Sequence, residues 1–180
     1  MNTPLDKETL LSILSSLDKK ALYFGPQGFE LANTETSLMH AQHGFSLKPD
    51  NTPLASEEAA NWQGNWLVIA TDTELGDPYF IDVEQAHLPV YTAMITDNNW
   101  QAQPVANSLA NFMQCLQCLA NASKQTQAQF IPEETTISDQ RTLTSLKSKL
   151  IKLSKCEHFW SLFFDCYADW LSDVDLEDDD

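Results

Sequence analysis

Residues 66–119 restrict the fold most. Their apolar residues follow the two-residue period of strands up to residue 95 and the period of a helix from residue 105. Residues 66–70 and 79–83 are short runs rich in strand-forming side chains. Turn residues that include Gly76 and Pro78 separate the two runs. The pattern therefore predicts an antiparallel hairpin.

A third strand and a helix are expected to follow this hairpin. Residues 89–95 alternate in the manner of a strand, and Asp97 comes soon after them. Apolar residues then recur at spacings of four, three, four and three, at Val105, Leu109, Phe112, Leu116 and Leu119. That spacing predicts a helix over 105–119 with one apolar face.

Further helices are predicted toward both ends of the chain. Leucines at helical spacing over 9–17 indicate a first helix that ends near Lys19 and Lys20, and a short second helix is expected to begin within 33–37. Two more are expected near the C-terminus, one capped by Ser138 and one over 157–172.

The remaining segments are predicted to be connections. Gly25, Pro26 and Gly28 indicate a break in the chain, and Ser56 could open a single helical turn. The polar residues 123–136 are expected to cross the surface as a loop.

This order of elements favours an α+β protein with a central antiparallel sheet flanked by N-terminal and C-terminal helices. A chain of 180 residues suits one domain with one sizeable core. We expect a core over 1–122, a helical extension over 123–173 packed on the same domain, and an acidic disordered tail over 174–180.

The charge distribution favours a basic protein as partner. The chain has 26 acidic and 10 basic residues, a formal net charge of -16, which disfavours binding to nucleic acid or to an anionic membrane. Between Lys48 and Lys124 there is no Lys or Arg, so exposed acids in that stretch lack local counter-ions. The expected partner-binding residues are Asp72, Glu74, Asp77, Asp82, Glu84, Glu57 and Glu58.

Motifs for catalysis or metal binding are weak in this sequence. Cys115 and Cys118 form a C-x-x-C, but no second pair of ligands is spaced to complete a zinc site, and His40 and His43 lack partners as well. No nucleotide-binding or nucleophile motif occurs. We therefore expect no metal, no cofactor and no enzymatic activity.

The apolar segments are too short to cross a membrane. The longest, over 159–171, is interrupted by Ser161, Asp165 and Asp169. The first residues lack the pattern of a secretory signal, so we expect a cytoplasmic protein whose four cysteines stay reduced.

A series of short motifs in the middle of the chain resembles the SUKH superfamily, the Smi and Knr type of domain. The series runs through 66–82, 89–93, Trp100 and 105–112. Within it the residues that match the loop and flanking strands of that family are Trp66, Asp72, Gly76, Asp77, Pro78, Tyr79 and Asp82. Residues 94–97 depart from the His-Gly turn often found there.

The resemblance implies an α+β fold and a non-enzymatic role in binding proteins. Many bacterial members are immunity proteins that neutralise a cognate toxin, often a nuclease or deaminase, and fungal members regulate cell-wall assembly and signalling. An acidic inhibitor could occupy the phosphate-binding surface of a basic, nuclease-like toxin. The alternative is a regulatory or scaffolding protein that forms a homodimer or docks partners through its C-terminal helix, around Trp160, Phe164 and Trp170.

Overall fold

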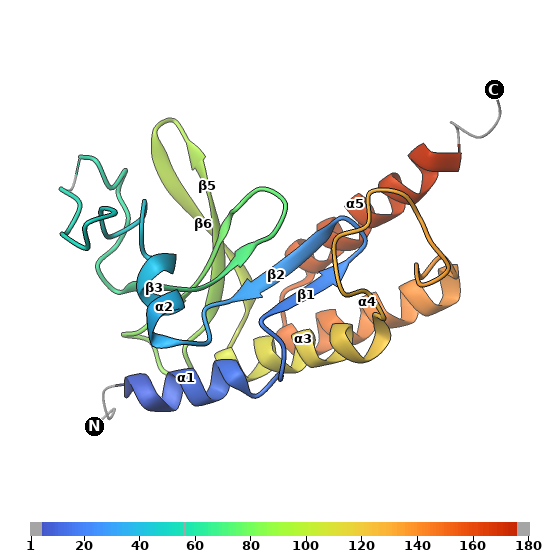
Figure 1. The fold of residues 1–180 in the computed structure, drawn as a ribbon, viewed down its shortest axis with the longest axis horizontal. Helices are drawn as coiled ribbons and strands as arrows, with labels where there is room; N and C mark the ends of the chain where they lie inside the picture. Colours follow the sequence, from blue (N-terminus) through green and yellow to red (C-terminus); the bar gives the residue numbers. More distant parts are fainter. Residues whose placement is uncertain (1–4, 56, 176–180) are drawn as a thin grey trace.

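The computed structural model describes residues 5–55 and 57–175, and its fold is α+β (Figure 1). Six antiparallel strands form one sheet in sequence order, and helices from both ends of the chain flank it, as predicted. In order, the elements are α1 (Lys7–Ser15), β1 (Ala21–Phe24), β2 (Gln27–Leu31), α2 (Glu35–Ala41), β3 (Trp66–Asp72), β4 (Pro78–Asp82), β5 (Val90–Thr96), β6 (Asn99–Ala106), α3 (Leu109–Ala122), α4 (Gln140–Ser154) and α5 (Glu157–Asp175).

The hairpin predicted in the middle of the chain is confirmed. β3 and β4 pair with Thr71 opposite Pro78 at the loop end and Trp66 opposite Asp82 at the other end. β5 then pairs with β4 on its far side. The turns β1–β2, β3–β4 and β5–β6 consequently lie at the same end of the sheet, because the strands alternate in direction.

The sheet has a large core on one face and a smaller aromatic cluster on the other. Tyr79 and Ile81 point into the large core with the apolar sides of α3, α4 and α5. Phe80, between them in sequence, points the other way and contacts Trp62 at a ring-centroid distance of 4.8 Å. This alternation follows from the two-residue period of a strand.

Aromatic side chains fix α5 across the large-core face. The ring of Tyr167 lies 4.6 Å from that of Phe24, and the ring of Phe163 lies 5.8 Å from that of Phe29. Trp160 is fully buried, and its indole N–H donates to the carbonyl of Val105 at 3.1 Å. These contacts tie α5 to both β1 and β6, the two outermost strands.

Three strands of the sheet, β1, β2 and β6, were not predicted from the sequence. The break predicted at Gly25 and Pro26 is the turn of a β1–β2 hairpin, in which Gly25 has a φ of +65°. β6 carries the polar residues Gln101 and Gln103, so it lacks an apolar run. Val105 belongs to this strand, and the predicted helix begins only at Leu109, with Ser108 as its N-cap.

The segment after α3 is more buried than the surface connection predicted for 123–136. Ser123 donates to the carbonyl of Tyr23 at 2.7 Å, and the side chain of Gln125 both accepts from the N–H of Gly25 and donates to its carbonyl. Ser123, Gln125 and Gln129 are all buried. Ser123 thus bonds the end of β1, and Gln125 and the N–H of Gln129 bond Gly25 in the β1–β2 turn.

Other boundaries differ by a few residues. α1 ends at Ser15 rather than near Lys19 and Lys20, and Asp139 rather than Ser138 caps α4, through a bond from the N–H of Thr142. α5 continues to Asp175. Ser56, where a helical turn was predicted, and the predicted tail beyond 175 lie outside the described residues.

Replacing Gly25 by alanine is expected to destabilise the fold strongly. A Cβ there would lie 2.7 Å from Cε2 of Tyr167, and the backbone would keep a positive φ. We expect Gly25→Ala to lower the free energy of unfolding by about 2–4 kcal/mol, measured by chemical denaturation. Gly64→Ala is the matched control, since a Cβ at Gly64 meets no atom within 4 Å. Equal effects of the two substitutions would contradict the described packing.

Candidate acidic contact site

The β3–β4 loop holds three of the predicted contact residues on a closed turn. The carboxylate of Asp72 accepts the N–H of Leu75 at 2.6 Å, and the N–H of Asp72 donates to the carbonyl of Asp77 at 2.8 Å. Glu74 and Leu75 are exposed at the tip of this turn, where 77% of Leu75 is accessible. The turn therefore presents acidic groups around a protruding apolar side chain.

Two acids of α5 lie beside this loop. Burial raises the pKa of the Cys166 thiol, and the negative charges of Asp169, Asp165 and Glu74 raise it further. Glu74 thus lies close to the same thiol as the two aspartates of the helix. We call Asp72, Glu74, Asp77, Asp165 and Asp169 the acidic loop–helix surface.

In the sequence, Asp165 and Asp169 stand out only as polar interruptions of the apolar segment over 159–171. Their spacing of four residues, together with Ser161, was the signal that one side of this helix is exposed. Nothing in the sequence showed that this side lies next to the β3–β4 loop. The juxtaposition arises because α5 packs across the sheet and contacts both β1 and β6.

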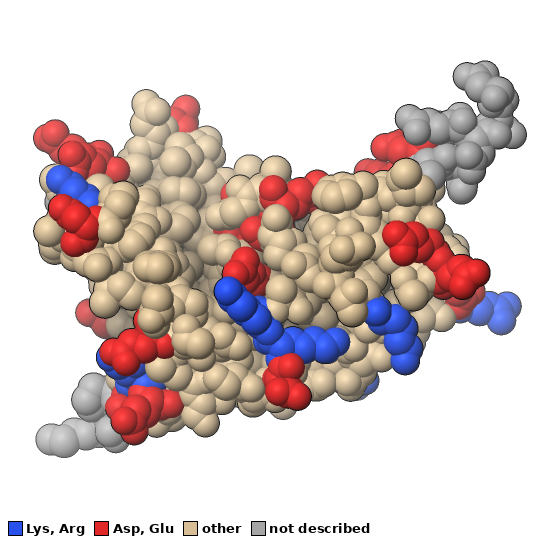
Figure 2. Space-filling view, viewed as in Figure 1, with Lys and Arg blue, Asp and Glu red and all other residues tan. Residues whose placement is uncertain are grey.

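The loop acids are not neutralised by the chain itself. Within residues 5–55 and 57–175, no ion pair involves Asp72, Glu74 or Asp77. Lys147 pairs with Asp165 at 3.7 Å, on the helix side of the surface. Figure 2 shows acidic side chains over the middle of the visible face, where the β3–β4 loop of Figure 1 lies. A basic partner would therefore meet free carboxylates here.

The Asp77 carboxylate is held in an environment that disfavours its charge. Partial burial raises the pKa of Asp77, and the neighbouring charge of Asp72 raises it further. Raised pKa values of this kind mean that the ionised form destabilises the folded state. The carboxylate at position 77 is not one that the fold needs.

Asp82 has the opposite character. Asn65 and Gln85 donate to its carboxylate at 2.7 and 2.6 Å, and so does the N–H of Glu84 at 3.0 Å. Burial opposes its ionisation, but these hydrogen bonds outweigh it and lower the pKa of Asp82. Asp82 is buried and organises the chain between β4 and β5, so it is a structural residue.

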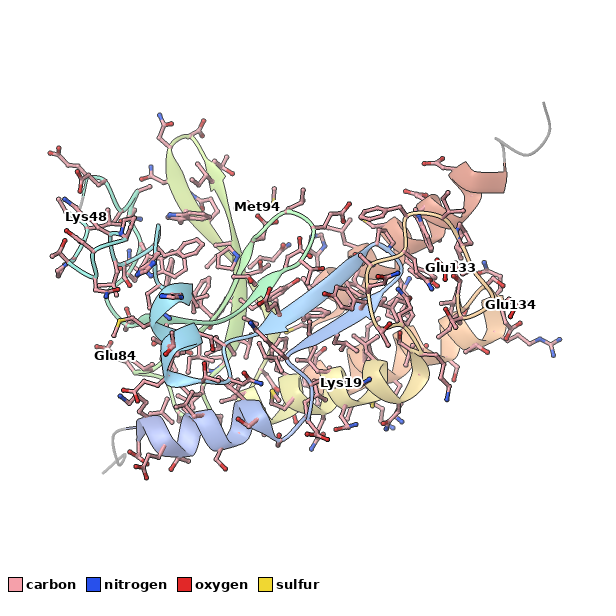
Figure 3. The ribbon with its side chains drawn as sticks, viewed as in Figure 1. Lys19, Lys48, Glu84, Met94, Glu133 and Glu134 are labelled. Carbon is pink, nitrogen blue, oxygen red and sulfur yellow. The ribbon has the colours of Figure 1, made fainter. Side chains whose placement is uncertain are left out.

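Asp82 and Glu84 also lie far from the β3–β4 loop. β4 separates them from Asp77, and a strand rises about 3.3 Å per residue, so Asp77 and Asp82 are about 16 Å apart. Glu84 is exposed at that other end, at the lower left of Figure 3. These two residues do not join the acidic loop–helix surface.

Glu57 and Glu58 occupy a third place. They precede Ala59 and Trp62, which belong to the small aromatic cluster on the other face of the sheet. Glu58 pairs with Lys48 at 3.5 Å, and Lys48 is labelled at the upper left of Figure 3. The seven predicted contact residues are thus divided among three sites, of which only the loop adjoins further acids of α5.

The aromatic residues of the alternative hypothesis are mostly inaccessible. Trp160 is 0% and Phe164 6% exposed, and both belong to the large core. Trp170 is partly buried and donates its indole N–H to the carbonyl of Phe130 at 3.0 Å. Leu162 of α5, by contrast, is exposed, at 51%.

The cysteines and histidines do not form a ligand site within the described residues, where no three potential metal-ligating side chains gather. Cys115 is buried, and burial is the main cause that raises its pKa to about 12. Cys166, by contrast, is exposed. His43 hydrogen-bonds Asn51 at 2.7 Å.

A polar cavity of about 270 Å³ lies between α2 and the β2–β3 part of the sheet. His40, Lys20 and Glu30 are among its lining residues. Glu30 pairs with Lys20 at 3.2 Å, and His43 does not line the cavity. The two histidines and an acid therefore do not converge there.

Comparisons with protein-family models, with curated proteins and with solved structures found no match to this chain. Among the described residues, no helix is long and apolar enough to cross a membrane.

Substitution of Asp77 and of Asp82 is expected to change the free energy of unfolding in opposite directions, because the pKa of Asp77 is raised and that of Asp82 is lowered. Asp77→Asn should raise the free energy of unfolding at pH 7 by up to about 0.5 kcal/mol, because it removes a disfavoured charge. Asp82→Asn should lower it by about 1–3 kcal/mol, since an amide N–H would face one of the three donors.

The pH dependence gives a second readout. As pH falls through the raised pKa of Asp77, the wild-type side chain becomes neutral, so the advantage of Asp77→Asn should shrink. The stabilisation from Asp82 is present at neutral pH and is lost as pH falls through its lowered pKa, so the Asp82→Asn deficit should also diminish there. Denaturation curves at several pH values measure both, and a destabilising Asp77→Asn would show that Asp77 serves the fold.

Proposed function

We propose that this chain is a non-enzymatic protein-binding module that docks a basic protein through the acidic loop–helix surface. The observation that carries the proposal is the state of the β3–β4 loop. Its three carboxylates have no cationic partner within the described residues, and the charge of Asp77 is a cost to the fold. Groups that weaken a fold and face solvent are typical of binding surfaces.

A field of this kind acts chiefly on the rate of association. Unneutralised carboxylates attract a cationic surface over about a Debye length and orient it before contact. Lys or Arg side chains of the partner would pair with Glu74 and Asp77. Opposite charge brought in by the partner would favour the ionised form of Asp77 and so offset the repulsion from Asp72 that raises its pKa.

The class of partner that fits best is a basic, nuclease-like toxin domain. Such proteins carry cationic surfaces for phosphate, and an acidic protein bound there would block the substrate. The resemblance of the loop motif to the SUKH superfamily supports the same immunity role. The proposal includes a cytoplasmic setting, in which the four free cysteines stay reduced.

The test is co-purification of the tagged chain from its own cells in two charge-matched variants. The first carries Asp72→Asn, Glu74→Gln and Asp77→Asn. The second removes the same number of charges elsewhere, at Glu57, Glu84 and Asp97, which are all exposed. Wild type and the second variant should recover a strongly basic protein that elutes as salt rises, and the first variant should lose most of it.

Equal recovery by both variants would overturn the proposal. So would a recovered partner that is neutral or acidic, or an association that does not respond to ionic strength. Unfolding curves for both variants control for loss of fold, because the carboxylate of Asp72 also accepts the N–H of Leu75 in the loop.

A further inference from the structure

The loop between α3 and α4 displays two large apolar side chains. Phe130 and Ile131 are adjacent in sequence, and their exposed fractions are 73% and 69%. The loop covers residues 123–139, and irregular loops longer than about 12–15 residues are usually functional when they are ordered. Adjacent bulky side chains in solvent are a common feature of docking surfaces.

Buried Gln129 fixes the backbone next to this pair. Its N–H donates to the carbonyl of Gly25 at 2.9 Å, and its side chain bonds the hydroxyls of Thr135 and Thr136 at 2.7 and 2.6 Å. The hydroxyl of Thr136 also accepts the N–H of Glu133 at 2.8 Å. The loop therefore closes on itself around one buried amide.

α5 holds the same loop from outside. Trp170 donates to the carbonyl of Phe130 at 3.0 Å, and the hydroxyl of Tyr167 donates to the carbonyl of Ile137 at 2.6 Å. The main chain of Phe130 is thus fixed while its ring points into solvent. A rigid presentation of this kind reduces the entropy lost on binding.

The charged residues nearest to the pair in sequence are acidic. Glu133 and Glu134 follow it on the loop and are exposed, at the right of Figure 3. Asp169 and Asp173, also exposed, lie on α5 within three residues of Trp170. A second copy of this chain, at a net charge of -16, would be repelled, whereas a basic protein would be attracted.

We propose that Phe130 and Ile131 form the apolar anchor of the complex and insert into an apolar pocket that Lys or Arg residues flank on a basic partner protein. This inference rests on the proposed function for the basic character of the partner. It adds a second contact, in which burial of the two apolar side chains slows dissociation of the complex. The acidic loop–helix surface, in contrast, speeds its formation.

The experiment places a photo-crosslinking benzoylphenylalanine at position 130 of the full-length chain in its own cells. Position 83 is the control, because Val83 is 39% exposed and follows Asp82, at the end of β4 opposite the β3–β4 loop. Illumination should give one dominant adduct from position 130 and none from position 83. The crosslinked peptide, mapped by mass spectrometry, should be apolar and flanked by Lys or Arg.

Two variants of the crosslinking chain test the chemistry. Charge reversal at Glu133→Lys with Glu134→Lys should lower the adduct yield about tenfold. Gln129→Ala keeps the crosslinker but removes the amide that positions the loop, so it should lower the yield while the chain remains folded by circular dichroism. Unchanged yields in both variants would overturn the inference.

The remaining outcomes separate the anchor from the proposed function. An adduct with a second copy of the chain, equal adducts from positions 83 and 130, or no adduct would each contradict the apolar anchor. If the acidic-loop variant loses its basic partner but position 130 gives no adduct, the proposed function survives and the anchor fails. If a basic partner is crosslinked at 130 and the acidic-loop substitutions leave it unaffected, the anchor survives and the proposed function fails.

Discussion

The packing of α5 on the sheet is the interaction on which the rest of the structure depends. Trp160, Phe163 and Tyr167 bury their rings against strands at both edges, and truncating one such ring typically costs about 3–5 kcal/mol. The same helix brings Asp165 and Asp169 beside the β3–β4 loop, and its Tyr167 and Trp170 hold the 123–139 loop. One helix thus positions both surfaces to which we assign binding.

Acidic residues have two distinct roles in this chain. The carboxylate of Asp82 satisfies three donors and stabilises the region between β4 and β5. The carboxylates of the β3–β4 loop lack cationic partners within the described residues, and burial beside Asp72 disfavours the charge of Asp77. Some acidic residues therefore stabilise the fold, and only the carboxylates without a cationic partner support a role in docking.

Periodicity predicted the elements with long apolar patterns and missed those without them. The β3–β4 hairpin, β5 and the helices α3 to α5 were readable because each buries a regular face. β1 and β2 were not predicted because Gly25 and Pro26, which form their turn, were interpreted as a break in the chain. β6 was not predicted because polar side chains and a proline occupy it. The local sequence could not show that the seven predicted contact residues would lie in three separate places. Nor could it show that Gln125 and Gln129 would be buried beside the β1–β2 turn, because both outcomes depend on tertiary packing.

The β3–β4 loop and the 123–139 loop both lie against α5, and we propose that both face one basic protein. Hydrogen–deuterium exchange of the chain, alone and in complex with the partner recovered from its cells, measures this contact directly. The account predicts slower exchange in residues 72–78 and 128–136 of the complex and unchanged exchange around Glu57 and Glu84. Protection around Glu57 or Glu84, with the two loops unchanged, would contradict it.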